Sequence, residues 1–220
     1  AFHLYDNKQT QSVHTKGTDV WRHIILDAIE YNWFQLYFQK TVDMNNNIVF
    51  QEIMLRLNYE NQLVSAGIFI PMAEHLEITR LIDRWVVEKI IQRIQSGSST
   101  TFCINLSRDS LQDPSFPAWL KTQVEQLSVY KHKQLMIEIP EYNVIKAFVE
   151  YKNLLTIMEP YACQFSIDHF GIGFASMSYL QDIKIDYILF GHIHECLIAD
   201  FYARSSSLCG ANAYSDSTLQ

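Results

Sequence analysis

The sequence predicts an α/β fold in which helices cover a mainly parallel sheet. Strand-like and helical patterns alternate along most of the chain, which is typical of βαβ units. A chain of 220 residues is long enough for one domain of this kind, either a (β/α)8 barrel or a doubly wound sheet. The strand-like segments lie at residues 101–106, 134–139, 163–168 and 185–190.

The segment 163–168 carries the clearest signal for a functional site. Apolar residues occupy every second position, as in a buried strand, and the segment ends at Asp168. Gly171 and Gly173 follow, and glycine permits backbone conformations and close approaches that a side chain would block. Because α/β folds place their chemistry at the carboxyl ends of strands, we expect a site beside Asp168.

The N-terminal part predicts a linker, a helix and a hairpin. Residues 1–17 are polar and predict an incoming linker, which leaves residues 18–220 as the barrel-like domain. Apolar residues share one face of a helix predicted at 19–31. Strands at 36–44 and 48–56 are joined by three asparagines, and so short a link makes them antiparallel. This hairpin favours neither of the two architectures on physical grounds.

Long helical patterns fill the intervals between the strands, at residues 72–95, 116–127 and 143–158, and a short helix follows Asp168. From Cys196 onward the sequence predicts one helix at most, followed by a tail rich in serine, glycine and asparagine. Two further βα units do not fit there. Either the barrel is incomplete at its C-terminal end or residues of it are missing.

Composition limits the classes of function. Hydrophobic residues make up 48% of the chain and charged residues 19%, which is typical of a globular domain. The net charge of −7 disfavours direct binding of nucleic acids, whose affinity depends on neutralising phosphates. No apolar run is long enough to span a bilayer, and the start at Ala1 indicates a piece of a longer protein. The four cysteines lack metal-ligand spacing, which favours reduced cytosolic thiols.

Four polar residues interrupt strand patterns that should be buried: Glu52, Asn105, Glu138 and Asp168. Burying three carboxylates together is costly unless cations compensate their charge. Oxygen ligands of this type suit Mg²⁺, Mn²⁺ or Ca²⁺. The alternative is that each acid lies at a solvated strand end and pairs with a nearby lysine or arginine. The residues alone favour neither interpretation.

Five ordered motifs resemble the EAL domain family, barrels that bind and hydrolyse the bacterial messenger cyclic di-GMP. The resemblance runs from about residue 21 to residue 190. It consists of Gln51 to Arg56 for the signature E-A-L-L-R, Phe69 to Glu74 for F-I-P-x-A-E, Asn105 to Ser107 for N-L-S, Glu138 to Glu141 for E-I-T-E, and Asp168 to Gly173 for D-D-F-G-T-G.

The resemblance implies a (β/α)8 barrel with an antiparallel first strand. It also implies that Mg²⁺ or Mn²⁺, if bound, is held by the four polar residues named above. Gln39 and Arg56, together with those four residues, would contact cyclic di-GMP.

The sequence departs from the family pattern at positions that hydrolysis requires. His169 replaces the second aspartate of D-D, and a neutral imidazole weakens a two-metal site. In the family's L-K-I-D segment, Leu189 replaces the lysine and Gly191 replaces the aspartate. The family lysine positions the attacking water, and leucine cannot do so. His192 and His194, predicted at a helix start, are interpreted as surface residues.

These losses predict a non-catalytic regulatory domain of a bacterial signalling protein, acting as a cyclic di-GMP receptor or a protein-interaction module. The alternative is an active, metal-dependent phosphodiesterase. The entry segment Lys16 to Arg22, the Glu-x-Met form of the signature and the pair Gln39-Lys40 most resemble CsrD/MshH-type GGDEF–EAL regulators, with LapD-type receptors next. That resemblance implies a preceding GGDEF domain, a protein partner, and a cytoplasmic location in an inner-membrane-anchored protein. It leaves a homodimer open.

Overall fold

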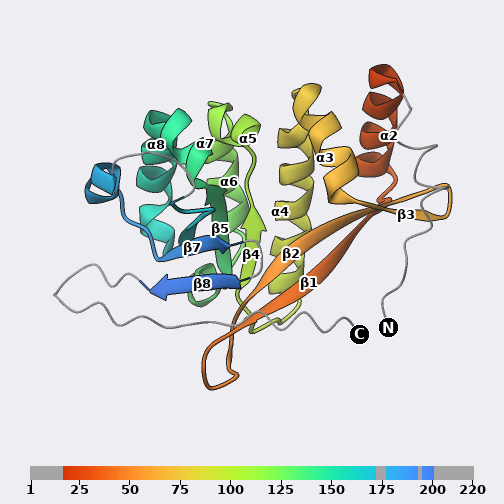
Figure 1. Cartoon of the computed structure of the whole chain (residues 1–220). Helices are drawn as coiled ribbons and strands as arrows, with labels where there is room; N and C mark the ends of the chain where they lie inside the picture. The colour runs from red at the N-terminus through yellow and green to blue at the C-terminus, as the bar shows by residue number, and fades with distance from the viewer. Residues whose placement is uncertain (1–16, 172–176, 193–194, 201–220) are drawn as a thin grey trace.

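A computed structural model describes residues 17–171, 177–192 and 195–200 of the chain. Figure 1 shows the labelled helices gathered along one side of a single sheet. The sheet has the order β1-β2-β4-β5-β6-β7-β8, and β3 pairs with β2 beside this path. The predicted α/β class is confirmed, and within the described residues the sheet is open, because β1 and β8 are not paired.

The strands combine a parallel centre with antiparallel ends. β2, β4, β5, β6 and β7 pair in parallel, whereas β1, β3 and β8 are antiparallel to their neighbours. The predicted hairpin is therefore confirmed. The bounds are β1 (Phe34–Val42), β2 (Ile48–Tyr59), β3 (Gln62–Ser65), β4 (Phe102–Asn105), β5 (Leu135–Pro140), β6 (Gln164–Asp168), β7 (Tyr187–His192) and β8 (Glu195–Asp200).

The helices follow the predicted order, but several are shorter and the described residues contain more of them than predicted. The α-helices are α2 (Thr18–Glu30), α3 (Ala66–His75), α4 (Thr79–Gln95), α5 (Arg108–Gln112), α6 (Phe116–Val124), α7 (Glu141–Lys146) and α8 (Phe148–Met158). Three 3-10 turns complete the connections: η1 (Val129–Gln134), η2 (Glu159–Tyr161) and η3 (Met177–Asp182). Across the described residues, no helix is both long and apolar enough to cross a bilayer.

Two predicted helices are each divided in two, and the single-helix predictions were wrong. The pattern at 72–95 is broken at Glu77, which adopts a left-handed conformation with φ of 55°. The pattern at 143–158 is broken at Ala147, which has φ of −129° and ψ of 47°. Neither position is a glycine or a proline, so no residue type there signals the end of a helix.

Two further differences concern strands. β3 was not predicted, because its turn uses Glu60 and Asn61 at positive φ (50° and 60°) instead of the asparagine–glycine pair that such hairpins favour. The stretch from Cys196 was expected to begin a helix, but it lies in β8. His192 ends β7 and does not start a helix, while His194 lies outside the described residues.

Alternation along the strands divides the core into two parts. The larger part lies between the sheet and the helices and contains Phe102, Ile137 and Ile167. The smaller part lies on the opposite strand face, here called the inner face, which is defined by Phe50, Cys103, Met136 and Leu189. Side chains at even positions of β2 and at every second position of β4, β5 and β6 share this inner face.

Candidate functional site

The strand register brings the four predicted polar residues to the inner face. Asn105 pairs with Glu138 across β4 and β5, and Asp168 pairs with Pro140, two positions further along. Glu52 is the last residue of β2 that pairs with β4, although β2 itself continues to Tyr59. Glu52 therefore marks the end of the parallel pairing and not the end of its strand.

Glu138 is the most buried member, with only 2% of its surface exposed. Burial, together with the nearby charges of Glu52 and Asp168, raises its pKa to about 8. Burial also raises the pKa of Glu52, with Asp168 adding to this effect and a hydrogen bond from Asn105 opposing it. The charge of Asp168 thus disfavours ionisation of both Glu52 and Glu138.

Hydrogen bonds partly satisfy these acids. Asn105 donates from Nδ2 to Oε1 of Glu52 at 3.0 Å. Cys103 donates from Sγ to Oε2 of Glu138 at 3.2 Å, and the Ser166 hydroxyl donates to the same oxygen at 3.4 Å. Burial and the adjacent Glu138 raise the pKa of the Cys103 thiol, which keeps its proton available for this bond. Sequence reasoning missed Cys103 and Ser166, although their alternation with apolar residues places them on the inner face.

The two other predicted ligand-binding residues lie on β1 and β2. Gln39 is exposed and pairs directly with Glu52, so both side chains point to the inner face. Arg56 lies further along β2, donates to the carbonyl of Leu55 at 2.9 Å, and lies 5.9 Å from the ring centroid of Tyr37. The binding roles of Gln39 and Arg56 stay predictions.

The three positions at which this chain departs from the family pattern differ in environment. His169 has a positive φ of 55°, its side chain is 62% exposed, and its Nδ1 contacts the carboxylate of Asp168. Leu189 is buried on the inner face, where it belongs to the same apolar cluster as Phe50 and Met136. Gly191 lies in β7, paired with β8. An apolar side chain therefore occupies the position at which the family has a lysine.

Glu141 is a further residue that the sequence reasoning did not assign. It begins α7 directly after β5 and is only 5% exposed. Its Oε2 accepts the backbone N–H of Gly171 at 3.0 Å, and its Oε1 accepts the hydroxyl of Tyr179 at 2.7 Å. Glu141 thus links Gly171 and Tyr179 to the same edge of the sheet as Glu138.

The donor chemistry of this edge suits a hard divalent cation. Three carboxyl groups and one amide supply oxygen atoms, and burial with neighbouring carboxylates raises the pKa values of Glu52 and Glu138, an effect that a bound cation would oppose. Within the described part of the chain, however, no three His, Cys, Asp or Glu side chains are gathered closely enough to hold a metal ion. The residues fit a divalent cation by type and charge, and holding it would require them to move closer together.

Comparison with known protein families gives a match to the EAL domain over residues 22–192. Cyclic di-GMP phosphodiesterase PdeF of Escherichia coli is 30% identical over 164 residues, which cover 72% of this chain and 22% of PdeF. RNase E specificity factor CsrD of Escherichia coli is 19% identical over 204 residues, which cover 93% of this chain and 31% of CsrD. The chain thus spans less than a third of the length of these relatives.

Solved structures resemble the fold. The FimX EAL domain from Pseudomonas aeruginosa bound to c-di-GMP has a TM-score of 0.69 and 26% identity, and the match covers 76% of this chain and 69% of that one. The Vibrio cholerae LapD S helix-GGDEF-EAL protein bound to c-di-GMP has a TM-score of 0.74 at 21% identity, covering 79% of this chain and 43% of that one. The likeness to LapD shows a shared fold alone.

Proposed function

The chain belongs to the EAL domain family, and on that premise we propose that it is a regulatory domain that binds cyclic di-GMP without hydrolysing it. The family includes proteins named as phosphodiesterases, such as PdeF, and domains solved with c-di-GMP bound, such as that of FimX. In this proposal the chain still binds cyclic di-GMP but has lost the ability to hydrolyse it.

The observation that carries the proposal is the environment of Leu189. This side chain is 6% exposed and packed into the inner apolar cluster. A general base or a water-orienting group must offer a polar atom near the scissile bond, and Leu189 offers none. His169 stands where the family has an aspartate, so a second group that would contribute to hydrolysis is missing. Removing one positioned acid–base group typically lowers a rate by about 10²–10⁴-fold.

Binding is more tolerant of such losses than catalysis is, because catalysis depends on contacts made only in the transition state. We infer that Glu52, Asn105, Glu138 and Asp168 hold Mg²⁺ or Mn²⁺. A bound cation would offset the repulsion between these acids and the two phosphates of the ligand. We infer that Arg56 and Gln39 contact the ligand directly, since a guanidinium can pair with a phosphate or stack on a base.

Calorimetric titration with cyclic di-GMP, with and without Mg²⁺, tests binding, and chromatography of the same samples tests for a linear product. We expect cation-dependent binding and no product. Arg56→Ala should weaken binding about tenfold or more, since charged hydrogen bonds contribute about 1.5–3 kcal/mol. Arg22→Ala, at an exposed position of α2, is the matched control and should bind like the unmodified chain.

Two other outcomes are informative. Robust turnover would restore the phosphodiesterase alternative, which the resemblance to PdeF favours. Absence of binding with and without cation would instead favour a protein-interaction module, as the similarity to RNase E specificity factor CsrD suggests. A homodimer and a cytoplasmic position in a membrane-anchored protein remain further parts of the proposal, testable by light scattering and by fractionation of cells that express the whole protein.

A further inference from the structure

Two small side chains donate to the same oxygen of Glu138. The Cys103 thiol donates to Oε2 at 3.2 Å, and the Ser166 hydroxyl donates to this oxygen at 3.4 Å. Cys103 is 0% exposed and Ser166 is 1% exposed, so water does not compete for either donor. A hydrogen bond shielded from water is electrostatically stronger than an exposed one, and the two donors together hold Oε2 in place.

The other oxygen of Glu138 has different surroundings. Within the part of the chain that the structure describes, no group donates a hydrogen bond to Oε1. Oε1 is nevertheless not one of the fully enclosed polar atoms without a partner, so part of its surface stays open. Oε1 is therefore the oxygen of Glu138 that a ligand can reach.

The strand register separates the two sides of Glu138 along the sheet. Cys103 lies two residues before Asn105, which pairs with Glu138, so the thiol approaches from the amino-terminal side. Asp168 lies two residues after Ser166, which also pairs with Glu138, and thus lies on the carboxyl-terminal side. Cys103 belongs to the inner apolar cluster, whose buried side chains carry no oxygen atoms. These placements favour the approach of a cation from the carboxyl-terminal side, through Oε1.

We propose that Cys103 and Ser166 are positioning residues that restrict Glu138 to binding a divalent cation through Oε1 alone. The inference rests on the cation site of the proposed function and assigns a preference to it. Mg²⁺ demands near-octahedral coordination and keeps several waters, whereas Ca²⁺ takes more oxygen ligands and often binds both oxygens of one carboxylate. A carboxylate that is held at Oε2 therefore suits Mg²⁺ and discriminates against Ca²⁺.

Calorimetric titration with magnesium chloride and with calcium chloride, both without nucleotide, measures this preference. Cys103→Ala combined with Ser166→Ala removes both donors and frees Oε2 for the cation. The affinity for Ca²⁺ relative to Mg²⁺ should then rise about tenfold, which is the size of one contact to a charged oxygen. Ser166→Ala alone disturbs the core less and should shift the preference in the same direction by a smaller factor. Near-ultraviolet circular dichroism shows whether each variant keeps its fold.

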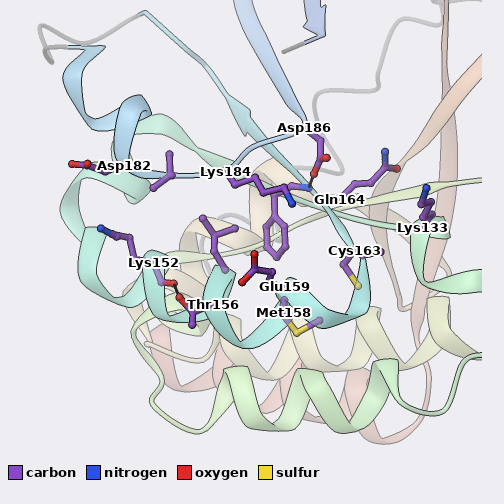
Figure 2. Close-up of a pocket in the computed structure, with 14 residues that line it drawn as sticks. Lys133, Lys152, Thr156, Met158, Glu159, Cys163, Gln164, Asp182, Lys184 and Asp186 are labelled. Atoms are coloured by element: carbon purple, nitrogen blue, oxygen red, sulfur yellow. Dashed lines mark hydrogen bonds between the residues drawn. The ribbon is translucent and has the colours of Figure 1, made fainter. Parts of the chain in front are cut away.

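Three further measurements separate positioning from a loss of packing. Cys103→Ser keeps a donor beside Oε2 and should keep the preference of the unmodified chain. Cys163→Ala is the matched control, because this second buried cysteine lies just before β6, among the residues that line the cavity in Figure 2, and should leave the preference unchanged. Infrared difference spectra of the carboxylate bands distinguish binding through one oxygen from binding through two. With Ca²⁺, they should show an additional two-oxygen carboxylate in the double variant.

The outcomes distinguish this inference from the proposed function. If both cations bind and the double variant keeps the original preference, or if Cys103→Ser and Cys163→Ala shift it as much as the double variant does, the inference is overturned and the proposed binding of cyclic di-GMP is untouched. A shifted preference in a protein that does not bind cyclic di-GMP would contradict the proposed function alone. Failure of both cations to bind the unmodified chain would overturn the inference.

Discussion

Two buried acids of this domain lie on opposite faces of the sheet and have different surroundings. Asp83, on α4, is 8% exposed and accepts hydrogen bonds from the N–H of Ser107 at 2.9 Å and from the hydroxyl of Ser110 at 2.7 Å. Glu138, on the inner face, is 2% exposed and, among the residues that the structure describes, accepts from the Cys103 thiol and the Ser166 hydroxyl alone, at longer distances.

The pKa values separate the two acids. Burial raises the pKa of Asp83 to about 6, against the lowering effect of its donors at Ser107 and Ser110. The pKa of Glu138 rises to about 8, because Glu52 and Asp168 add like charges to the effect of burial. Burial alone therefore does not mark a functional acid. A structural acid such as Asp83 accepts from two donors, whereas Glu138 faces other acids and has no positive partner within the described ranges.

The largest expected effect concerns Glu138. Its pKa is raised in the folded state, so its contribution to stability is full below about pH 4.5 and is lost as the pH rises to about 8. In chelator-containing buffer, this loss should amount to about 5 kcal/mol. Glu138→Gln should remove that part of the pH dependence, as measured by urea unfolding at a series of pH values. Parallel pH curves for both proteins would show that Glu138 does not titrate as expected.

Asp83→Asn should remove a smaller effect in a lower pH range. The pKa of Asp83 rises from 3.8 to about 6 in the folded state. The domain should therefore lose the contribution of Asp83 to its stability between about pH 4 and pH 6, a lower range than that of Glu138. The expected size is on the order of 3 kcal/mol, measured by the same unfolding experiment. If Asp83→Asn altered the curve above pH 7 instead, the two acids would be coupled and the comparison between them would fail.

Divalent cations should act on one acid and not on the other. Millimolar Mg²⁺ or Mn²⁺ should stabilise the folded domain by about 2–3 kcal/mol once the cation exceeds its Kd about 100-fold. Thermal unfolding measures this shift, with sodium chloride at equal ionic strength as the control. Glu138→Gln should reduce the stabilisation, and Asp83→Asn should preserve it. Equal stabilisation of all three proteins would place the cation elsewhere.

The smallest expected effect concerns Asn105, which is exposed and donates to Glu52. Asn105→Ala should destabilise the domain by about 1 kcal/mol, because the Glu52 carboxylate loses a donor. The pKa of Glu52 should rise further, since the hydrogen bond from Asn105 lowers it. Nuclear magnetic resonance of the glutamate side-chain carbonyl carbons can follow that titration. An unchanged Glu52 titration would show that the hydrogen bond is absent in solution.

Periodicity and spacing were sufficient to predict the sheet, the hairpin and the parallel centre. They failed where the backbone turns without glycine or proline, as at Glu77 and Ala147, because tertiary contacts hold conformations that the local sequence does not favour. They also failed for β8, since a short apolar run such as residues 196–200 fits a strand or a helix equally well.

The candidate site was partly predictable for a similar reason. Glu52, Asn105, Glu138 and Asp168 stood out because polar residues interrupt buried strand patterns. Cys103 and Ser166 did not, since small residues fit a buried strand without explanation and only the register shows that they face Glu138. The family resemblance was enough to predict that Leu189 replaces a lysine. Its burial within an apolar cluster could be seen only in the structure.

The two oxygens of the Glu141 carboxylate couple two separate parts of the chain. One oxygen accepts from the N–H of Gly171 and the other from the hydroxyl of Tyr179, so these two hydrogen bonds depend on a single residue. If the carboxylate turned away, both hydrogen bonds would be lost in the same event, whereas the hydrogen bond from the N–H of Phe170 to the carbonyl of Leu189 does not involve Glu141. Gly171 and Tyr179 thus lose their contact with Glu141 together, while Phe170 keeps its own.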